Sequence, residues 1–363
     1  MTPKQKIYLY TSDIAAFIGK NPYDIVTPFE RLWKRCDPTG YTIALERSKD
    51  VIRANKTELI ELRQQELILD DDLENKRITK RQFTIQKNKL LEKKTKVQQD
   101  INVISDQIDD IDLSQQQKLE RAIGKEIVEQ ITSADVETED KRKQVNKIMD
   151  TTDLEPEKLH AIKKHAESFI NKSHGTIKEV DAISMYEKKF GVSLDVSQQL
   201  VKYFLERASK DSNYDWYICG KMDGVYQDPS NPERSYIVEV KNRTRGFFSS
   251  LRDYEKVQIQ AYMLMRGMRR SQLVEKYNNR IRVTEIYYDC DFVNDIETYL
   301  SIFIKNTEQN FLQNADVKAQ YINLDNDKKR AFIRRLYLND IMQSVNDKIE
   351  HTNNSDCMID DLD

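Results

Sequence analysis

The chain has 363 residues, of which 39% are hydrophobic and 33% charged, a balance that favours a polar protein of two or three domains. No apolar run approaches the roughly 18 residues of a membrane span, and no signal peptide opens the chain, so we expect an intracellular protein. The four cysteines form no CxxC pair, which argues against a zinc ribbon, and a net charge of −3 means that nucleic acid would have to bind a local basic patch.

The N-terminal segment, residues 1–45, contains "YTSDIAAFIGKNPYD". Ser12 is a residue type typical of a helix N-cap, and Gly19 is typical of a helix end. We therefore predict a short helix between them.

The following segment, residues 46–150, has no proline and a single glycine, Gly124. Its apolar residues recur at helical spacing among dense charges. This pattern predicts two long helices that fold back as an antiparallel hairpin, with a turn near residues 75–79. The arm is either a solvated spacer or a surface that contacts a partner or guides DNA.

The remaining chain predicts a mixture of helices and strands. We expect one helix that ends near Gly175, a second at 176–190, strands at 214–227, 235–241 and 281–289, and a helix at 250–267. The fold class is therefore α/β (α+β), with a small mixed central sheet flanked by helices. The predicted domain order is 1–45 and 151–310 for the main core, 46–150 for the inserted arm, 311–350 for a C-terminal helical segment and 351–363 for an acidic, disordered tail.

The stretch "IVEVKNRTRG", residues 237–246, places an acid and a lysine in a strand that otherwise has a buried composition. Since side chains alternate along a strand, Val238 and Val240 should face one side while Glu239 and Lys241 face the other. One alternative is an exposed edge strand with a simple ion pair. The other is a catalytic pair.

Asp223 supplies a second acid near the end of the strand predicted at 214–227. Asp-Gly is a common hairpin turn, but apolar Val225 and Tyr226 continue the strand, and "DPSNPERS" offers a better turn. If the two strands are neighbours, Asp223 and Glu239 meet on one face. Converging carboxylates repel each other unless a hard cation such as Mg²⁺ binds between them.

Further polar residues come from two predicted helices. Glu179 lies on the helical face that should enter the core, where it needs a cation, or it lies at the flank of that face and reaches water. Gln258 and Tyr262 share a face of the helix at 250–267 and could contact the lysine or DNA phosphates. Taken alone, they are ordinary polar residues at the edge of a core.

Together these segments resemble the PD-(D/E)xK nuclease superfamily. The resemblance is carried by Glu179 in a Gly-Thr-x-x-Glu helix start, Asp223 in "GKMDG", "EVK" at 239–241 and "QIQAYM" at 258–263. The N-terminal "YTSDIAAFIGKNPYD" is similar to the YqaJ-like viral recombinase branch, which includes the phage lambda exonuclease. The resemblance covers residues 8–36 and 172–290, and not the helical arm.

The resemblance implies a Mg²⁺-dependent DNA exonuclease, with Mn²⁺ as a substitute ion, that acts 5′ to 3′ on duplex ends in recombination. It implies that Asp223, Glu239, Glu179 and the carbonyl of Val240 hold the metal, that Lys241 is catalytic and that Gln258 is the motif glutamine. It also implies that Ser12 holds a terminal phosphate. A single-strand-annealing or single-strand-binding protein is an expected partner, and an oligomer is compatible with this branch.

Two other functions are compatible with the same residues. A sequence-specific endonuclease would use the same metal chemistry, and a catalytically idle scaffold would keep the fold for binding. Arg243 and Arg245 flank the site, where they either contact phosphates or form a soluble basic rim.

Overall fold

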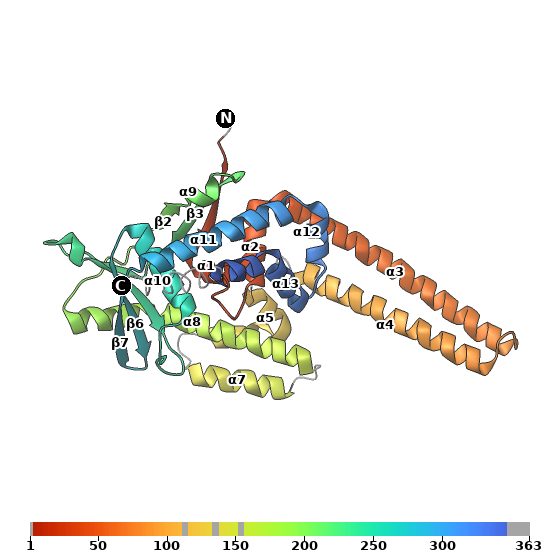
Figure 1. The fold of residues 1–363 in the computed structure, drawn as a ribbon. Coiled ribbons are helices and arrows are strands. Elements are labelled where there is room, and N and C mark those ends of the chain that lie inside the picture. The colour runs from red at the N-terminus through yellow and green to blue at the C-terminus, as the bar shows by residue number, and fades with distance from the viewer. Residues whose placement is uncertain (1–2, 111–114, 133–137, 152–155, 347–363) are drawn as a thin grey trace, which may run out of the picture. The chain divides into compact units, whose positions relative to one another are not determined.

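The computed structural model describes residues 3–110, 115–132, 138–151 and 156–346 of the chain. These residues form a mixed α/β fold with two small sheets and several long helices, which confirms the predicted fold class (Figure 1). Within them, no helix has the length and apolarity that crossing a membrane would need.

The described helices are α1 (Thr11–Phe17), α2 (Val26–Cys36), α3 (Pro38–Glu74), α4 (Lys80–Asp110), α5 (Gln115–Ile123), α6 (Lys125–Thr132), α7 (Thr138–Thr151), α8 (Pro156–Phe190), α9 (Glu206–Ser209), α10 (Asp253–Arg266), α11 (Cys290–Thr307), α12 (Ala315–Ile322) and α13 (Asn326–Ile333). The described strands are β1 (Gln5–Tyr10), β2 (Val201–Phe204), β3 (Tyr214–Gly220), β4 (Gly224–Tyr226), β5 (Tyr236–Asn242), β6 (Arg270–Tyr277) and β7 (Arg280–Tyr287).

The larger sheet has the strand order β4-β5-β6-β7, in which only the β5 and β6 pair is parallel. One face carries Val238 and Val240, which pack against Tyr186 of α8. The opposite face carries Ile237, which packs against Ile259 of α10. Strand β5 therefore alternates between two helical layers as predicted, and its polar residues lie on the α10 side.

The smaller sheet has the order β1-β3-β2, with β1 parallel and β2 antiparallel to β3. Its pairing brings together strands about 200 residues apart in the sequence, since Gln5 is opposite Tyr214. Strands β1, β2 and β6 were not predicted from the sequence.

The predicted helical hairpin is present. Helices α3 and α4 run side by side (Figure 1), and the turn between them falls at residues 75–79 as expected. Leu59 and Leu62 of α3 pack against Val97 and Ile101 of α4, and Lys94 bridges to Glu66 at 2.5 Å. Apolar contacts and cross-helix ion pairs therefore close the hairpin on itself.

Residue packing divides the chain into two compact units, Met1–Tyr23 with Leu113–Ser301 and Asp24–Asp112 with Ile302–Asp363. The second unit has an aromatic core, in which the ring centroid of Trp33 lies 4.7 Å from that of Tyr41 and 4.9 Å from that of Phe311. The domain boundaries predicted from sequence stay predictions, and the expected tail at 351–363 lies outside the described residues.

Three local predictions are wrong. The helix break at Gly175 is absent because α8 continues through it; a glycine inside a helix costs only about 1 kcal/mol. Ser12 does not cap α1, since Tyr10 holds that position and Ser12 is the second helical residue. The strand expected at 214–227 is split, because β3 and β4 join different sheets and Asp223 lies between them.

Candidate active site

The polar residues of β5 form a hydrogen-bonded chain with α10. The ammonium of Lys241 donates to Oε1 of Glu239 at 2.6 Å and to Oε1 of Gln258 at 3.3 Å. The amide of Gln258 donates to the hydroxyl of Tyr262 at 3.1 Å, and that hydroxyl donates to the carbonyl of Lys221 at 2.8 Å. The spacing of four residues places Gln258 and Tyr262 on one face of α10, directed at the sheet.

Asp223 is fixed to the same strand by the backbone. Strand β4 pairs with β5 only as far as the Gly224–Val238 pair, so the N–H of Val240 has no strand partner on that edge. It donates instead to Oδ2 of Asp223 at 2.7 Å. Since the N–H and C=O of one strand residue point to the same edge, the carbonyl of Val240 is directed to the side where Asp223 lies.

Glu179 approaches the site from α8. It is half-buried, and its Oε1 accepts a 2.8 Å hydrogen bond from Gln198. Gln198 lies in the loop before β2 with φ of 49°, in the left-handed region that non-glycine residues rarely adopt. Glu179 therefore lies at the flank of the site and has a polar partner in Gln198, in agreement with one of the two predicted alternatives.

The carboxylates influence one another strongly. Burial raises the pKa of Glu239 to about 8, and the Asp223 carboxylate adds to this effect while Lys241 opposes it. Burial also raises the pKa of Asp223, and burial together with Asp223 raises that of Glu179. Burial alone would lower the pKa of Lys241, but attraction to Glu239 and Asp223 outweighs it, so the ammonium stays protonated.

The candidate site contains more acidic than basic groups, so a bound cation would be favourable there. Three acids share one ammonium, and Oε2 of Glu239 is buried without a hydrogen-bond partner among the described residues. A buried carboxylate oxygen without a partner is costly. No three His, Cys, Asp or Glu side chains in the described ranges converge closely enough to hold a metal by themselves. Mg²⁺ needs only one or two carboxylates besides water, so the pair Asp223 and Glu239 fits this ion.

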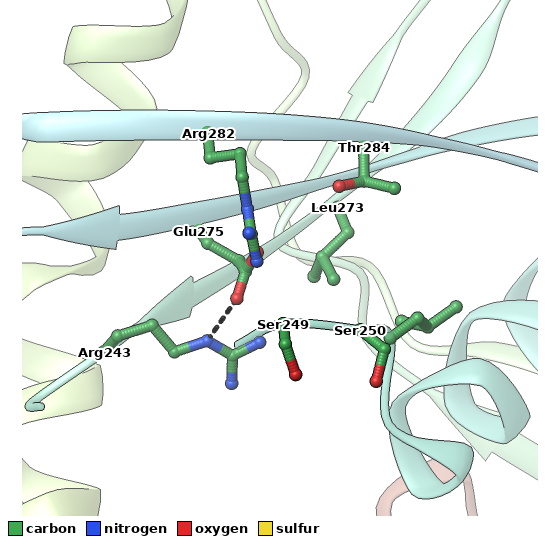
Figure 2. Close-up of a pocket in the computed structure, with 8 residues that line it drawn as sticks. Arg243, Ser249, Ser250, Leu273, Glu275, Arg282 and Thr284 are labelled. Carbon is green, nitrogen blue, oxygen red and sulfur yellow. Dashed lines mark hydrogen bonds and ion pairs between the residues drawn. The ribbon is translucent and has the colours of Figure 1, made fainter. Parts of the chain in front are cut away.

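Arg243 makes ion pairs within the protein and has neither of its two expected roles, a phosphate contact or part of a soluble basic rim. Its side chain is 8% exposed and makes ion pairs at 2.7 Å with both Glu255 and Glu275. Arg282 pairs with the other oxygen of Glu275. Figure 2 shows the two guanidinium groups on either side of the Glu275 carboxylate, in a pocket also lined by Ser249 and Ser250. These contacts hold Arg243 in place and account for its charge.

Arg245 and Ser12, the other two predicted phosphate contacts at the edge of the site, are both exposed. The side chain of Arg245 is 73% exposed and is 3.8 Å from Glu167. Ser12 is exposed on the seven-residue helix α1. Neither position is brought into the hydrogen-bonded chain around Lys241.

Two further residues that contact Tyr262, Thr11 and Gly220, were not predicted from the sequence. The side chain of Thr11 forms a hydrogen bond with Tyr262. A methyl group on Gly220 would lie 2.4 Å from Oγ1 of Thr11 and 2.7 Å from the Tyr262 ring. Glycine at this position lets both side chains reach the end of β3. The motif "GKMDG" contained this glycine, but only the pairing of β1 with β3 reveals its role.

Comparison with known proteins gives little support for a family. No family model matches the chain, and no curated protein matches it. The crystal structure of SSO0001 is similar at 16% identity and a TM-score of 0.29, covering 45% of this chain and 83% of that one.

An alkaline exonuclease (LHK-Exo) from Laribacter hongkongensis is similar at 14% identity and a TM-score of 0.29, covering 60% of this chain and 98% of that one. Its complex with dAMP gives 13% identity and a TM-score of 0.27, with 57% and 92% coverage. At these scores a likeness identifies neither the family nor the activity of a chain.

Proposed function

We propose that this protein is a Mg²⁺-dependent deoxyribonuclease that acts as an exonuclease at duplex ends. The observation that carries the proposal is the buried Glu239 carboxylate, which has an unpartnered oxygen, a pKa raised to about 8, and both Asp223 and Lys241 within electrostatic reach. Buried acids with raised pKa values beside other acids are characteristic of functional sites, and a bound divalent cation would supply the positive charge that this site lacks.

The proposed roles follow from the geometry. Asp223, Glu239 and the carbonyl of Val240 would hold the cation, and the N–H of Val240 keeps the Asp223 carboxylate oriented at 2.7 Å. A bound divalent cation would offset the charge of the scissile phosphate and make water a better nucleophile. Glu179 would contact this cation through water, a role that its half-buried position at the flank of the site and its hydrogen bond from Gln198 support.

Lys241 is the proposed catalytic residue. Two of its three N–H groups are directed to Glu239 and Gln258, which leaves the third to donate to water or to a phosphate oxygen. Gln258 and Tyr262 fix the ammonium by linking it to the carbonyl of Lys221. A positioned cation of this kind stabilises charge that develops in the transition state.

The exonuclease assignment, the 5′ to 3′ polarity and a role in recombination rest on the sequence resemblance of "GKMDG", "EVK" and "QIQAYM". Arg245 and Ser12 are proposed phosphate contacts because both are exposed. Mn²⁺ should substitute for Mg²⁺, since both accept oxygen ligands. A single-strand-annealing or single-strand-binding partner belongs to the same proposal.

The test is incubation of the full chain with end-labelled duplex, closed circular duplex and single-stranded DNA in Mg²⁺, with gel analysis of product lengths. We expect progressive shortening of linear duplex, intact circles, and no cleavage in excess chelator. Asp223→Asn, purified in parallel, controls for contaminating nuclease. Cleavage of circles would instead identify an endonuclease, and the absence of cleavage of every DNA in Mg²⁺ and Mn²⁺ would support an idle scaffold.

A further inference from the structure

The sheet β1-β3-β2 has one buried face and one partly open face, on which Tyr8 and Tyr217 are half-buried, Lys202 and Phe204 are exposed and Cys219 is buried. Ile7, Leu9, Trp216 and Ile218 are at most 2% exposed and form the inner face. The alternate residues of the same strands lie on the outer face, where Phe204 is 42% exposed. A sheet that packs on one side only normally has polar residues on its open side, so large rings there need a reason.

Three aromatic rings cross this outer face in a single row. Tyr8 is directly opposite Tyr217 in the parallel pair, and Tyr217 is directly opposite Phe204 in the antiparallel pair. The ring centroids of Tyr8 and Tyr217 are 5.6 Å apart, and those of Tyr217 and Phe204 are 5.2 Å apart. The row therefore spans all three strands of the sheet.

One lysine from each edge strand lies close to these rings. The ammonium of Lys202 lies 4.6 Å from the centroid of the Tyr8 ring, and that of Lys6 lies 5.9 Å from the Tyr217 ring. Asp215, opposite Lys6, is the only carboxylate among the strand residues of this outer face. Cation–π contacts at exposed sites are weak, so a stacked base can displace each ammonium, which then reaches a phosphate.

Strands β1 and β3 connect the row to the candidate active site along the chain. Strand β3 runs on from Tyr217 to Gly220, and Asp223 follows three residues later. Strand β1 runs from Tyr8 into α1, where Thr11 contacts Tyr262. Six residues of extended chain from Tyr217 to Asp223 span at most about 20 Å, a distance that a few nucleotides can cover.

We infer that the outer face of β1-β3-β2 binds single-stranded nucleic acid, with bases stacked on Tyr8, Tyr217 and Phe204 and phosphates paired with Lys6 and Lys202. Rows of exposed aromatic residues on a sheet, with basic neighbours, bind single strands in this way because every base offers a π face. Binding here would hold one separated strand near the acids. This role in the reaction rests on the proposed nuclease function, whereas the binding itself needs no metal.

The test is the affinity of a labelled oligo-dT for the full chain, measured by fluorescence anisotropy in EDTA on an Asp223→Asn background. Tyr217→Leu removes the π face, and Tyr217→Phe keeps it. We expect roughly tenfold weaker binding for Tyr217→Leu and less than about twofold change for Tyr217→Phe. Phe204→Leu, on the edge strand, should weaken binding similarly and is a second probe in case Tyr217→Leu loosens the sheet.

The matched control is Tyr287→Leu, which removes an exposed tyrosine from β7 of the other sheet and should leave the affinity unchanged. Equal affinity of the leucine and phenylalanine variants at Tyr217, together with an unaffected Phe204→Leu, would overturn the inference and leave the row as cross-strand packing. No measurable oligo-dT binding by the background protein would overturn it as well. A protein that binds oligo-dT through these rings but cleaves no DNA would refute the proposed function alone.

Discussion

Glu239 and Glu275 lie on neighbouring parallel strands, face the same side of one sheet and are 2% and 1% exposed. Their environments nevertheless differ. Burial raises the pKa of Glu239 to about 8, with Asp223 adding to the effect. Burial acts in the same direction on Glu275, but hydrogen bonds from Arg282 and Arg243 outweigh it and lower the pKa.

The difference comes from the number of cations at each position. Around Glu275, two carboxylates share two guanidinium groups, so every charge is compensated. Around Glu239, three acids share the single ammonium of Lys241. Burial alone therefore does not mark a reactive carboxylate. A buried acid that lies beside other acids with too few cations retains the capacity to bind a cation, which is the role proposed for Glu239.

Neutralising each acid in turn tests the difference between Glu239 and Glu275 most strongly. Glu239→Gln should lower the rate of DNA cleavage on the order of a thousandfold, because it removes an anionic metal ligand while conserving volume. Glu275→Gln should leave cleavage within about threefold wherever the protein stays folded. Single-turnover cleavage of end-labelled duplex measures both, and similar losses in the two variants would contradict the distinction.

Stability should respond in the reverse order. Glu275→Gln leaves Arg243 and Arg282 with one fewer anion in a buried network, which should lower the free energy of unfolding by roughly 3 kcal/mol. Glu239→Gln removes an acid whose ionisation is opposed by burial and by Asp223, and it leaves Asp223 to balance Lys241, so it should destabilise the metal-free protein at about pH 8 less than Glu275→Gln does. Urea denaturation in EDTA measures both values. A larger loss for Glu239→Gln would mean that Glu239 is a structural ion-pair residue.

Lys241→Ala separates catalysis from structure within the uncompensated site. If the ammonium stabilises charge in the transition state, its loss should slow cleavage about a hundredfold while DNA affinity in Ca²⁺ changes little. Its exposed fraction of 27% and its bond to Glu239 are equally compatible with a simple ion pair. Single-turnover rates at saturating DNA decide, since unchanged turnover in the alanine variant is the result expected of an ion pair alone.

The pH dependence of stability tests the protonation state of Glu239 in the folded protein. The pKa of Glu239 is about 8 in the folded metal-free protein, against about 4.3 in an unfolded chain. The folded state thus keeps a proton that the unfolded chain has released, so the free energy of unfolding should fall as pH rises through this window. Denaturation in EDTA from about pH 5 to pH 9 should show this fall in the wild type and a weaker one in Glu239→Gln. An identical slope in both would contradict the assignment.

Short-range patterns were sufficient to predict how several of the candidate residues are arranged. Alternation along β5 correctly separated Val240 from Glu239 and Lys241, and helical spacing correctly placed Gln258 and Tyr262 together. The hairpin was equally accessible, because its apolar spacing and the absence of proline are local features.

Long-range pairings were not predictable. Strand β6 was missed, so nothing indicated that Glu275 would neutralise Arg243. The parallel pairing of β1 with β3 joins distant segments, and it alone explains Thr11 and Gly220. These features depend on which strands become neighbours, and neither periodicity nor residue type specifies this.

The most direct test of the central claim is a titration of the metal-free protein with Mn²⁺, with free Mn²⁺ measured by electron paramagnetic resonance. Wild type and Glu275→Gln should bind the ion with equal affinity, and Glu239→Gln should bind it at least tenfold more weakly, because a first ligand contributes more than the supporting residues around it. Equal affinity in all three proteins, or no binding by the wild type, would contradict the view that the uncompensated carboxylate at Glu239 is a metal site.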